Sequence, residues 1–444
     1  MEQNQYIITR CHLSSDKLGG FDTNTIDIQA LVLEINLYES IYSMCITGEI
    51  SILDDKSLFD EINFTGTERL HLEIAGLDRD SEPVMQKIFV MDAIKQESRA
   101  SNSQAAYTFS LIEEHGILAT TRKLRNSYRG SLDEIIKKIA VGHLNKNVDI
   151  SYLEDTITIQ NEIRVIIPNL NPNKAIKWLT SRATTKTGSP YFIWTTIHDD
   201  NFRFGNLDAM YTQEPWNEKL PYTFNPSNAN LTEKLGEVEK AFIINGIFPG
   251  PSSNLLESIV EGHYGANQET TNLNTGQIER RHFDIGNTLV NLDLEGVVDR
   301  GKQNVYDETY LLDDKVLGEY DALNIHSILS TGTYGDLKSY HDEFDKDLLT
   351  KKLESASLNN LLLKNTFEVT VPGTGFFLGK ATVGDTVNLK IVNSNLDINE
   401  KSTESELIDK KKSGKHLITK LRHTFRGTKH EVMMQVASFE QEFV

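Results

Sequence analysis

Alternation of apolar and polar residues dominates the first quarter of the chain. Five segments between residues 30 and 114 have this period of two and are separated by turn residues: ALVLEINLYESI, ITGEISILDD, RLHLEIAG, KIFVMDAIKQE and AYTFSLIEE. Such a period predicts strands with one face in a core. In the first segment it places Leu31, Leu33, Ile35 and Leu37 on one face. We therefore predict a small antiparallel barrel or sandwich that ends near Glu114.

A helical period replaces the alternation after residue 115. GSLDEIIKKIAVGHL opens with a capping box formed by Ser131 and Glu134 and continues as an apolar stripe. NPNKAIKWLTSRA predicts a second helix, with Asn171 as its cap and Pro172 at its first position. SPYFIWTTIHDDNFRFGNLD is typical of a two-stranded hairpin with its turn at HDDN.

The rest of the chain returns mainly to β patterns. VEKAFIINGIFPG, NLLESIVEGHYG, GQIERRHFDIG and NTLVNLDLEG indicate short strands, and SYHDEFDKDLLTKKLESASL indicates a charged helix over 336–358. NTFEVTVPGTGFFLGKATVGDTVNLKIV and the last hairpin indicate a second β domain. The charged stretch 393–415 between them is predicted to be a mobile loop.

These patterns together predict an α+β fold that is mainly β. The expected division is a first barrel over 1–115, an α+β domain over 116–225, a mixed β segment over 226–335 that contributes to a second barrel and an insertion, and a charged helix plus the second barrel over 336–444.

The composition restricts the partners. The net charge is −19, which is expected to repel nucleic acid and anionic membranes. The start, MEQNQYIITR, lacks the features of a secretory signal, and no stretch approaches the roughly 18 apolar residues of a membrane helix. Cys11 and Cys45 are the only cysteines, so we expect two reduced thiols in a protein folded in the cytoplasm.

Three histidines near the C-terminus are spaced by seven residues: His416, His423 and His430. If Arg426 to Lys429 form the turn of the last hairpin, His423 and His430 become diagonal neighbours on its apolar face, and His416 points to the opposite side. Zinc normally takes at least three protein ligands, and at most two converge here. We therefore interpret these histidines as structural and predict no metal site.

Other candidate sites are also weak. VPGTGFFLG, from Val371 to Gly379, has the glycines of a phosphate-binding loop, but a turn and a strand are predicted after it rather than a helix. Its glycines are therefore assigned to turn and bulge positions. Glu113, Glu114 and His115 are consecutive, so the two carboxylates point apart and cannot flank one bond. We predict no catalytic residue and no cofactor.

The tryptophans suggest no binding site either. Trp178 and Trp194 fall on the predicted inner faces of a helix and a strand, so both are expected in the core. Trp216, in EPWNEK, is expected to be exposed. One exposed aromatic side chain does not make a binding site.

The order of several segments resembles the central baseplate hub proteins of contractile-tailed bacteriophages. The likeness begins with the pattern ITG-I-I-D and then G-E-L-L, carried here by Ile46, Thr47, Gly48, Ile50, Ile52 and Asp54, and by Gly66, Glu68, Leu70 and Leu72. YRGSLDEIIKKIA, VIIPNLNPNKAIKWLTSRA with its FIWTTIHDDNFRF hairpin, VTVPGTGFFLGKATVGDTVNLKI and SGKHLITKLRHTF follow in the family's order. Residues 265–335 match nothing in the family.

The resemblance implies two barrels of the tail-tube type in each chain, so that a homotrimer presents six barrels to a sixfold tube. The implied partners are a tail tube or tube-initiator protein above, a central spike below and baseplate wedge proteins, with genomic DNA passing through unbound. The base of type VI secretion spikes is similar. The implied location is the baseplate of a virion tail that is assembled in the host cytoplasm.

The acidity of the chain has a role in this interpretation, because carboxylates lining a channel would let DNA slide. Two alternatives from other classes remain: a tail-associated peptidoglycan hydrolase and a carbohydrate-binding β module.

Overall fold

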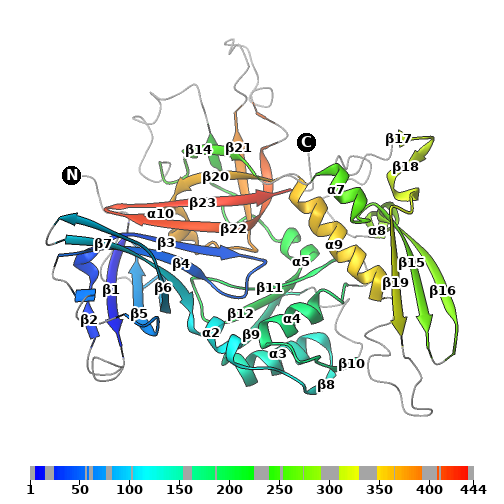
Figure 1. Cartoon of the computed structure of the whole chain (residues 1–444). Helices are drawn as coiled ribbons and strands as arrows, with labels where there is room; N and C mark the ends of the chain where they lie inside the picture. Colours follow the sequence, from blue (N-terminus) through cyan, green and yellow to red (C-terminus); the bar gives the residue numbers. More distant parts are fainter. Residues whose placement is uncertain are drawn as a thin grey trace, which may run out of the picture.

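The computed structural model of the chain (Figure 1) describes residues 6–15, 25–55, 58–59, 64–76, 83–101, 104–153, 163–185, 188–224, 240–250, 254–273, 275–291, 310–329, 348–364, 366–392, 408–409 and 412–438. No helix in these ranges is long and apolar enough to cross a membrane. The described residues are mainly β with a minority of helix, which confirms the predicted fold class.

The N-terminal β region contains all five predicted strands and two more. Its strands are β1 (Ile7–Ser14), β2 (Thr25–Asp27), β3 (Val32–Ser40), β4 (Thr47–Asp54), β5 (Glu68–Ala75), β6 (Met85–Ser101) and β7 (Gln104–Glu113). The last strand ends at Glu113, as predicted. Leu33 is exposed rather than inward, because a bulge between Val32 and Glu34 shifts the register of β3.

Glu68 shows why one residue of the hub-like pattern matters structurally. Its buried carboxylate accepts hydrogen bonds from the backbone N–H groups of Thr65, Gly66 and Thr67 at 2.8 to 3.0 Å, and another from the Thr65 hydroxyl. Gly66 has a φ of +81°, a conformation that glycine adopts without strain. The pair therefore fixes the tight turn that leads into β5.

The α+β region follows. Its elements are α2 (Glu114–Thr121), β8 (Ser127–Gly130), α3 (Leu132–Leu144), β9 (Val148–Tyr152), β10 (Ile163–Ile166), α4 (Pro172–Thr180), β11 (Tyr191–Thr195), β12 (Phe202–Asn206), α5 (Leu207–Thr212) and β13 (Tyr222–Phe224). The two helices predicted in this region are present as α3 and α4, and the predicted hairpin is present as β11 and β12. Asn171 caps α4 by accepting from the N–H of Lys174 at 2.7 Å, whereas Ser131 occupies the cap position of α3 without a side-chain hydrogen bond.

The next segment differs most from the expectation. It contains β14 (Gly246–Pro249), α7 (Leu255–Val260), β15 (Gly265–Asn272), β16 (Ile278–Asp284), α8 (Ile285–Asn291), β17 (Leu311–Leu312), β18 (Lys315–Val316) and β19 (Leu323–Leu329). The predicted strands in NLLESIVEGHYG and NTLVNLDLEG are wrong, because α7 and α8 lie there. Asn254 and Asp284 favour these helices by accepting from the N–H groups of Leu256 and Gly286.

The C-terminal region contains α9 (Leu348–Lys364), β20 (Thr366–Pro372), α10 (Gly373–Gly379), β21 (Thr386–Ile391), β22 (Gly414–Arg426) and β23 (Lys429–Ala437). The predicted charged helix is confirmed from Leu348 onward and runs to Lys364, while 336–347 lie outside the described residues. Most of the predicted loop 393–415 also lies outside them.

The glycines of Val371–Gly379 do not form turns and bulges as predicted. They lie in α10, directly after β20. A Cβ on Gly373 would lie 2.0 Å from Nδ1 of His430, and one on Gly379 would lie 2.4 Å from the ring of Trp216. The glycines therefore permit close packing of a short helix, which a local pattern of turn residues does not reveal.

Thirteen strands form one sheet in the order β14-β20-β23-β22-β3-β4-β7-β6-β5-β1-β2, with β13 and β21 paired beside β22. The N-terminal and C-terminal parts of the sheet are joined by the pairing of β22 with β3, which runs from Lys420 opposite Ser40 to Arg426 opposite Glu34. Two separately closed barrels were expected, but within the described strands this order is an open path that joins the two β regions. Figure 1 shows β3, β4, β22 and β23 side by side across the molecule.

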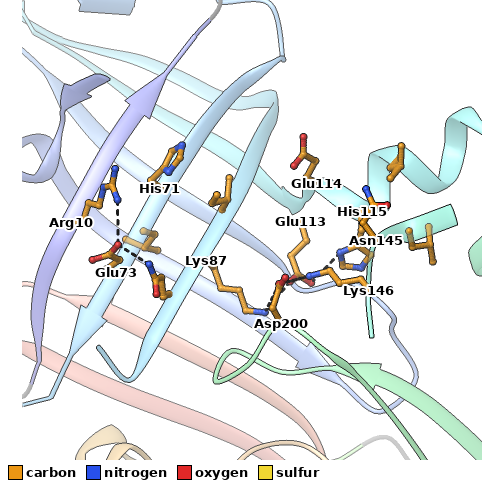
Figure 2. Close-up of a pocket in the computed structure, with 15 residues that line it drawn as sticks. Arg10, His71, Glu73, Lys87, Glu113, Glu114, His115, Asn145, Lys146 and Asp200 are labelled. Carbon is orange, nitrogen blue, oxygen red and sulfur yellow. Dashed lines mark hydrogen bonds and ion pairs between the residues drawn. The ribbon is translucent and has the colours of Figure 1, made fainter. Parts of the chain in front are cut away.

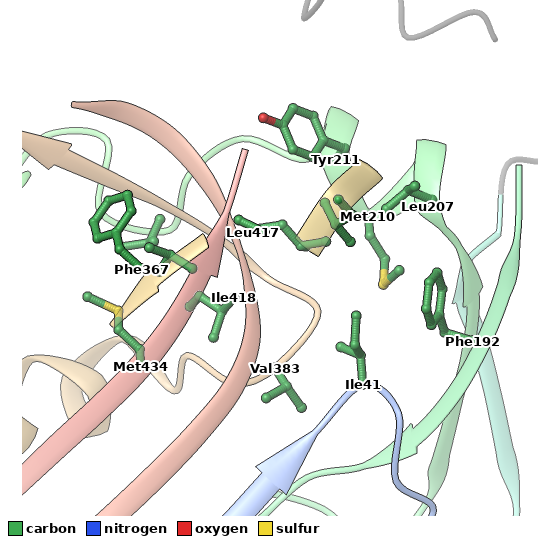
Figure 3. Close-up of a cluster of buried hydrophobic side chains, with 14 of the residues drawn as sticks. Ile41, Phe192, Leu207, Met210, Tyr211, Phe367, Val383, Leu417, Ile418 and Met434 are labelled. Carbon is green, nitrogen blue, oxygen red and sulfur yellow. The ribbon is translucent and has the colours of Figure 1, made fainter. Parts of the chain in front are cut away.

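Apolar side chains form two main cores along this sheet. The N-terminal core includes Ile35, Ile50, Leu70 and Phe109, which are fully buried. The C-terminal core joins β22 and β23 to the α+β region, because Phe192, Leu207 and Met210 pack with Leu417, Ile418 and Met434 (Figure 3). Ile41, in the turn after β3, lies among them.

Candidate functional site at the junction of three regions

The turn between β11 and β12 lies where the three regions meet, and its first three residues are buried. We call Thr195–Asn201 the junction turn. Ile197 is fully buried in the N-terminal core, although it belongs to the α+β hairpin. Nδ1 of His198 lies 3.2 Å from the carbonyl oxygen of Val84, and its Nε2 lies 3.0 Å from that of Ala381. The turn therefore contacts the N-terminal β region and the C-terminal region at once.

Glu113, at the end of β7, is the buried centre of an ion-pair network beside this turn (Figure 2). Its carboxylate lies 3.1 Å from Nζ of Lys87. It also accepts hydrogen bonds from the N–H of Ile46 at 2.8 Å and from the hydroxyl of Thr195 at 3.3 Å. Lys87 and Ile46 belong to the N-terminal β region, and Thr195 belongs to the α+β region. Glu113 therefore links these two regions.

Two further charged residues complete the network. Lys87 also donates to the carbonyl oxygen of Asp199, and Lys146, after α3, pairs with Asp200. A cleft of about 670 Å³ opens over the network. The residues that line it come from β1, β5, β6, β7, α2, the end of α3 and the junction turn: Arg10, His71, Leu72, Glu73, Gln86, Lys87, Ile88, Glu113, Glu114, His115, Leu118, Leu144, Asn145, Lys146 and Asp200.

The carboxylates of this cleft are not arranged for glycoside hydrolysis. Glu113 points inward, whereas Glu114 is exposed and pairs with Arg69, so the prediction that they point apart is confirmed. Glu113 and Asp200 each lie against a lysine ammonium. A glycosidase needs two carboxyl groups facing one bond across open space, one of them able to donate a proton. Here the charged groups neutralise one another.

Cys45 and His115 resemble a nucleophile and its base, with Sγ 3.2 Å from Nε2. The same nitrogen, however, lies 2.6 Å from the carbonyl oxygen of Met44, so it must carry a hydrogen and cannot accept the thiol proton. Burial and the nearby Glu113 raise the pKa of Cys45 to about 12, and burial lowers the pKa of His115. The geometry therefore gives no activated thiolate.

Within the described residues Cys11 and Cys45 are both free thiols, as predicted.

His423 and His430 form a buried chain of hydrogen bonds with Glu39. Nδ1 of His423 lies 3.1 Å from Nε2 of His430, and its Nε2 lies 3.1 Å from Glu39, as the predicted hairpin register requires. Burial disfavours the ionised Glu39, but the hydrogen bond and charge of His423 outweigh it and lower the pKa of the carboxyl. Burial and the adjacent His423 hold the pKa of His430 well below its usual value.

His416 does not face the opposite side as predicted. A bulge between Ile418 and Lys420 reverses the alternation of β22, so the ring packs edge-on against Phe367 on the inner face of the sheet. No group of three or more metal-ligating side chains occurs within the described ranges.

Acid is expected to destabilise the protein partly through His416. Burial lowers its pKa to about 4, whereas an unfolded histidine titrates near about 6.5. Between these values only the unfolded state binds the proton, so stability is complete above about pH 6.5 and falls as the pH drops toward 4. The loss from this residue is about 3 kcal/mol. Denaturant unfolding across this range should show it.

His416→Asn is expected to flatten the slope of unfolding free energy against pH by a similar amount, because the titrating ring is gone. Asparagine can still donate to the carbonyl oxygen of Gly414. His326→Asn, on a ring that is 68% exposed, serves as the control and should keep the wild-type slope. An unchanged slope in His416→Asn would contradict the assignment.

Of the three predictions for tryptophans, that for Trp194 is confirmed, that for Trp178 holds in part and that for Trp216 is wrong. Trp194 is fully buried, as expected, and Trp178 packs at the edge of a core beside the guanidinium of Arg182. Trp216 is half-buried rather than exposed, because its ring contacts Tyr222 and Phe376. The close approach of α10 brings these rings together.

Sequence reasoning missed Lys87, Lys146 and His198. One signal was available: Met85, Lys87, Phe89 and Met91 share one face of β6, so a lysine stands in an apolar row. A cation on an inward face requires a buried partner, which Glu113 supplies. The location of the HDDN turn between other regions has no local signal, because it depends on the packing of segments that are distant in the sequence.

No family model matches the sequence. No curated protein matches it either.

Solved structures do match the fold over nearly its whole length. The tail protein from Neisseria meningitidis MC58 has a TM-score of 0.50 and 10% identity, with 98% of this chain and 97% of that chain covered. The 43 kDa tail protein of prophage MuSo2 from Shewanella oneidensis has a TM-score of 0.48 and 9% identity, with 98% and 100% covered.

A third match is an E. coli component of the type VI secretion system, described as structurally similar to the T4 tail proteins gp27 and gp5. It has a TM-score of 0.42 and 9% identity, with 98% of this chain and 76% of that chain covered. At 10% identity the Neisseria match establishes the fold. The resemblance to tail proteins is thereby confirmed at the level of the overall fold, whereas two separately closed barrels are not seen among the described strands.

Proposed function

From the premise that this chain has a phage tail-protein fold, we propose that it is a structural component of a contractile tail, namely the hub of the baseplate. The observation that carries the proposal is the end-to-end match to the Neisseria tail protein, which covers 98% of this chain. In this role three copies form a ring that joins a tail tube or its initiator above to a central spike below, beside baseplate wedge proteins. The protein then resides in the virion tail.

The outer face of the sheet supports a channel-lining role. Opposite the cores, neighbouring strands present rows of polar residues: Asn36 and Tyr38 on β3, Glu49 and Ser51 on β4, and Arg422 and Thr424 on β22. Thr424 donates to Asn36 at 2.9 Å, and Arg422 donates to the same oxygen. Such a face needs no apolar cover and can face water.

Several cations on this face have partners within the chain. Lys95 lies 2.6 Å from Glu49, and Arg426 lies 3.7 Å from Glu34. Non-specific affinity for DNA comes from lysine and arginine contacts with phosphates. Cations that are held by carboxylates, in a chain of net charge −19, leave a wall along which DNA slides.

A ring requires heterologous contacts between copies, whereas isologous pairing would stop at a dimer. Electron microscopy and native mass measurement of the full-length protein at micromolar concentration test this arrangement. The expected result is a threefold ring with a central hole and three times the 50.2 kDa mass of one chain. A monomer or a twofold dimer would contradict the proposal.

The same preparation separates this role from that of a hydrolase. Purified cell wall should keep its turbidity when the protein is added, because Glu113 and Asp200 are each paired with a lysine ammonium. Loss of turbidity that is abolished by Glu113→Gln or Asp200→Asn would overturn the structural role in favour of a peptidoglycan hydrolase. Binding to immobilised glycans would favour a carbohydrate-binding module instead.

A further inference from the structure

His198 in the junction turn has two ring nitrogens that both face acceptors. The carbonyl oxygens of Val84 and Ala381 lie 3.2 and 3.0 Å away. A carbonyl oxygen cannot donate, so each contact is a hydrogen bond only if the nitrogen carries a hydrogen. The neutral ring carries one such hydrogen and the protonated ring carries two. Only the protonated ring makes both contacts.

The two acceptors belong to different parts of the chain. Val84 immediately precedes β6 in the N-terminal β region, and Ala381 follows α10 in the C-terminal region. The ring itself belongs to the α+β hairpin, whose Ile197 is anchored in the N-terminal core. Loss of one hydrogen bond therefore weakens a tie between regions rather than a contact within one.

Several charged groups lie near the turn. Glu39 on β3 and Asp385 before β21 both interact electrostatically with His198. Burial raises the pKa of Asp385, while the charges of Arg203 and His198 oppose that shift. Other titratable groups packed around these residues include Asp199 and Asp200 in the turn itself, Glu113 on β7, Lys87 on β6, Lys146 after α3, Tyr152 on β9, His423 on β22 and His430 on β23.

We infer that the junction turn is a proton-dependent latch. With His198 protonated, the ring ties the N-terminal β region, the α+β hairpin and the C-terminal region together. When the ring is deprotonated, one nitrogen loses its hydrogen and its carbonyl contact becomes repulsive. The turn then opens more often, while Ile197 and Glu113 keep the regions attached. This property goes beyond the proposed function and does not depend on it.

Hydrogen exchange of the full-length protein tests the latch. Amide protection is measured for peptides spanning 195–201, 83–86 and 380–384 at about pH 6 and about pH 8.5, after correction for intrinsic exchange rates. Loss of one hydrogen bond predicts a fall in wild-type protection of about tenfold at the higher pH. Peptides from the centre of β3 should keep their protection. Equal protection at both pH values would overturn the inference without any variant.

Two variants separate His198 from the other histidines. His198→Gln can keep at most one of the two contacts and carries no titrating ring, so its protection should be low at both pH values. His282→Gln is the matched control, since His282 also lies between two acceptors, Asp321 and the carbonyl oxygen of Gly318, but far along the chain in β16. It should retain the wild-type response. Persistence of that response in His198→Gln would refute the latch.

Discussion

Replacement of Glu113 by alanine is expected to lower the free energy of unfolding by about 3 to 5 kcal/mol. The side chains of Glu113 and Lys87 are only 3% and 2% exposed, so removal of the carboxylate leaves a buried ammonium without its main counter-charge. The N–H of Ile46 and the hydroxyl of Thr195 lose their acceptor as well. Denaturant unfolding near neutral pH measures the effect.

Two comparisons separate the buried pair from a general loss of charge. Glu114→Ala removes the adjacent carboxylate, which is 53% exposed in its pair with Arg69, and should cost no more than about 1 kcal/mol. The double variant Lys87→Met, Glu113→Leu removes both buried charges and should recover much of the loss. If Glu113→Ala were as mild as Glu114→Ala, the network would not hold the regions together.

The second large effect is expected from Gly373→Ala, which should destabilise the protein by about 3 kcal/mol. The new methyl carbon would lie 2.0 Å from Nδ1 of His430 unless the helix or the ring moved. His430 is fully enclosed between Phe377 and Phe425, so neither movement is easy. Thermal and denaturant unfolding would both report the loss.

Gly142→Ala is the matched control. Gly142 lies inside α3, and a Cβ there meets nothing within 4 Å. The same substitution should therefore stabilise the protein by about 0.5 to 1 kcal/mol, since alanine favours the helix more than glycine does. Similar effects of the two substitutions would show that close packing of α10 is not what Gly373 provides.

The strands of the N-terminal region were predictable because their residues carry the signal locally. Ile50 and Ile52 alternate with Glu49 and Ser51, and only one face can be buried. β15 was missed because its sequence, GANQETTN, is polar, and its inner face is completed by contacts such as Gln268 with Thr350 of α9. That stabilisation comes from another element and leaves no mark on the strand itself.

The same difference between local signals and distant contacts applies to the junction turn and its surroundings. The absence of a facing carboxylate pair followed from the adjacency of Glu113 and Glu114 alone. The contacts of His198 with two other regions did not follow, because a turn rich in aspartate is typical of a solvent-exposed hairpin. The predicted face of His416 was wrong for a related reason. One extra residue at a bulge reverses which residues of a strand point to each face, and the local sequence gives no sign of the bulge.

The pairing of β22 with β3 has a consequence for biosynthesis. Arg422 binds Asn36 across 386 positions of sequence, so the partner strand leaves the ribosome long after β3 does. At about 5 to 20 residues per second this delay is tens of seconds, during which one edge of β3 has no native neighbour. Nascent chains are therefore expected to need protection from premature association, and translation that stops short of β22 should yield aggregates rather than a stable fragment.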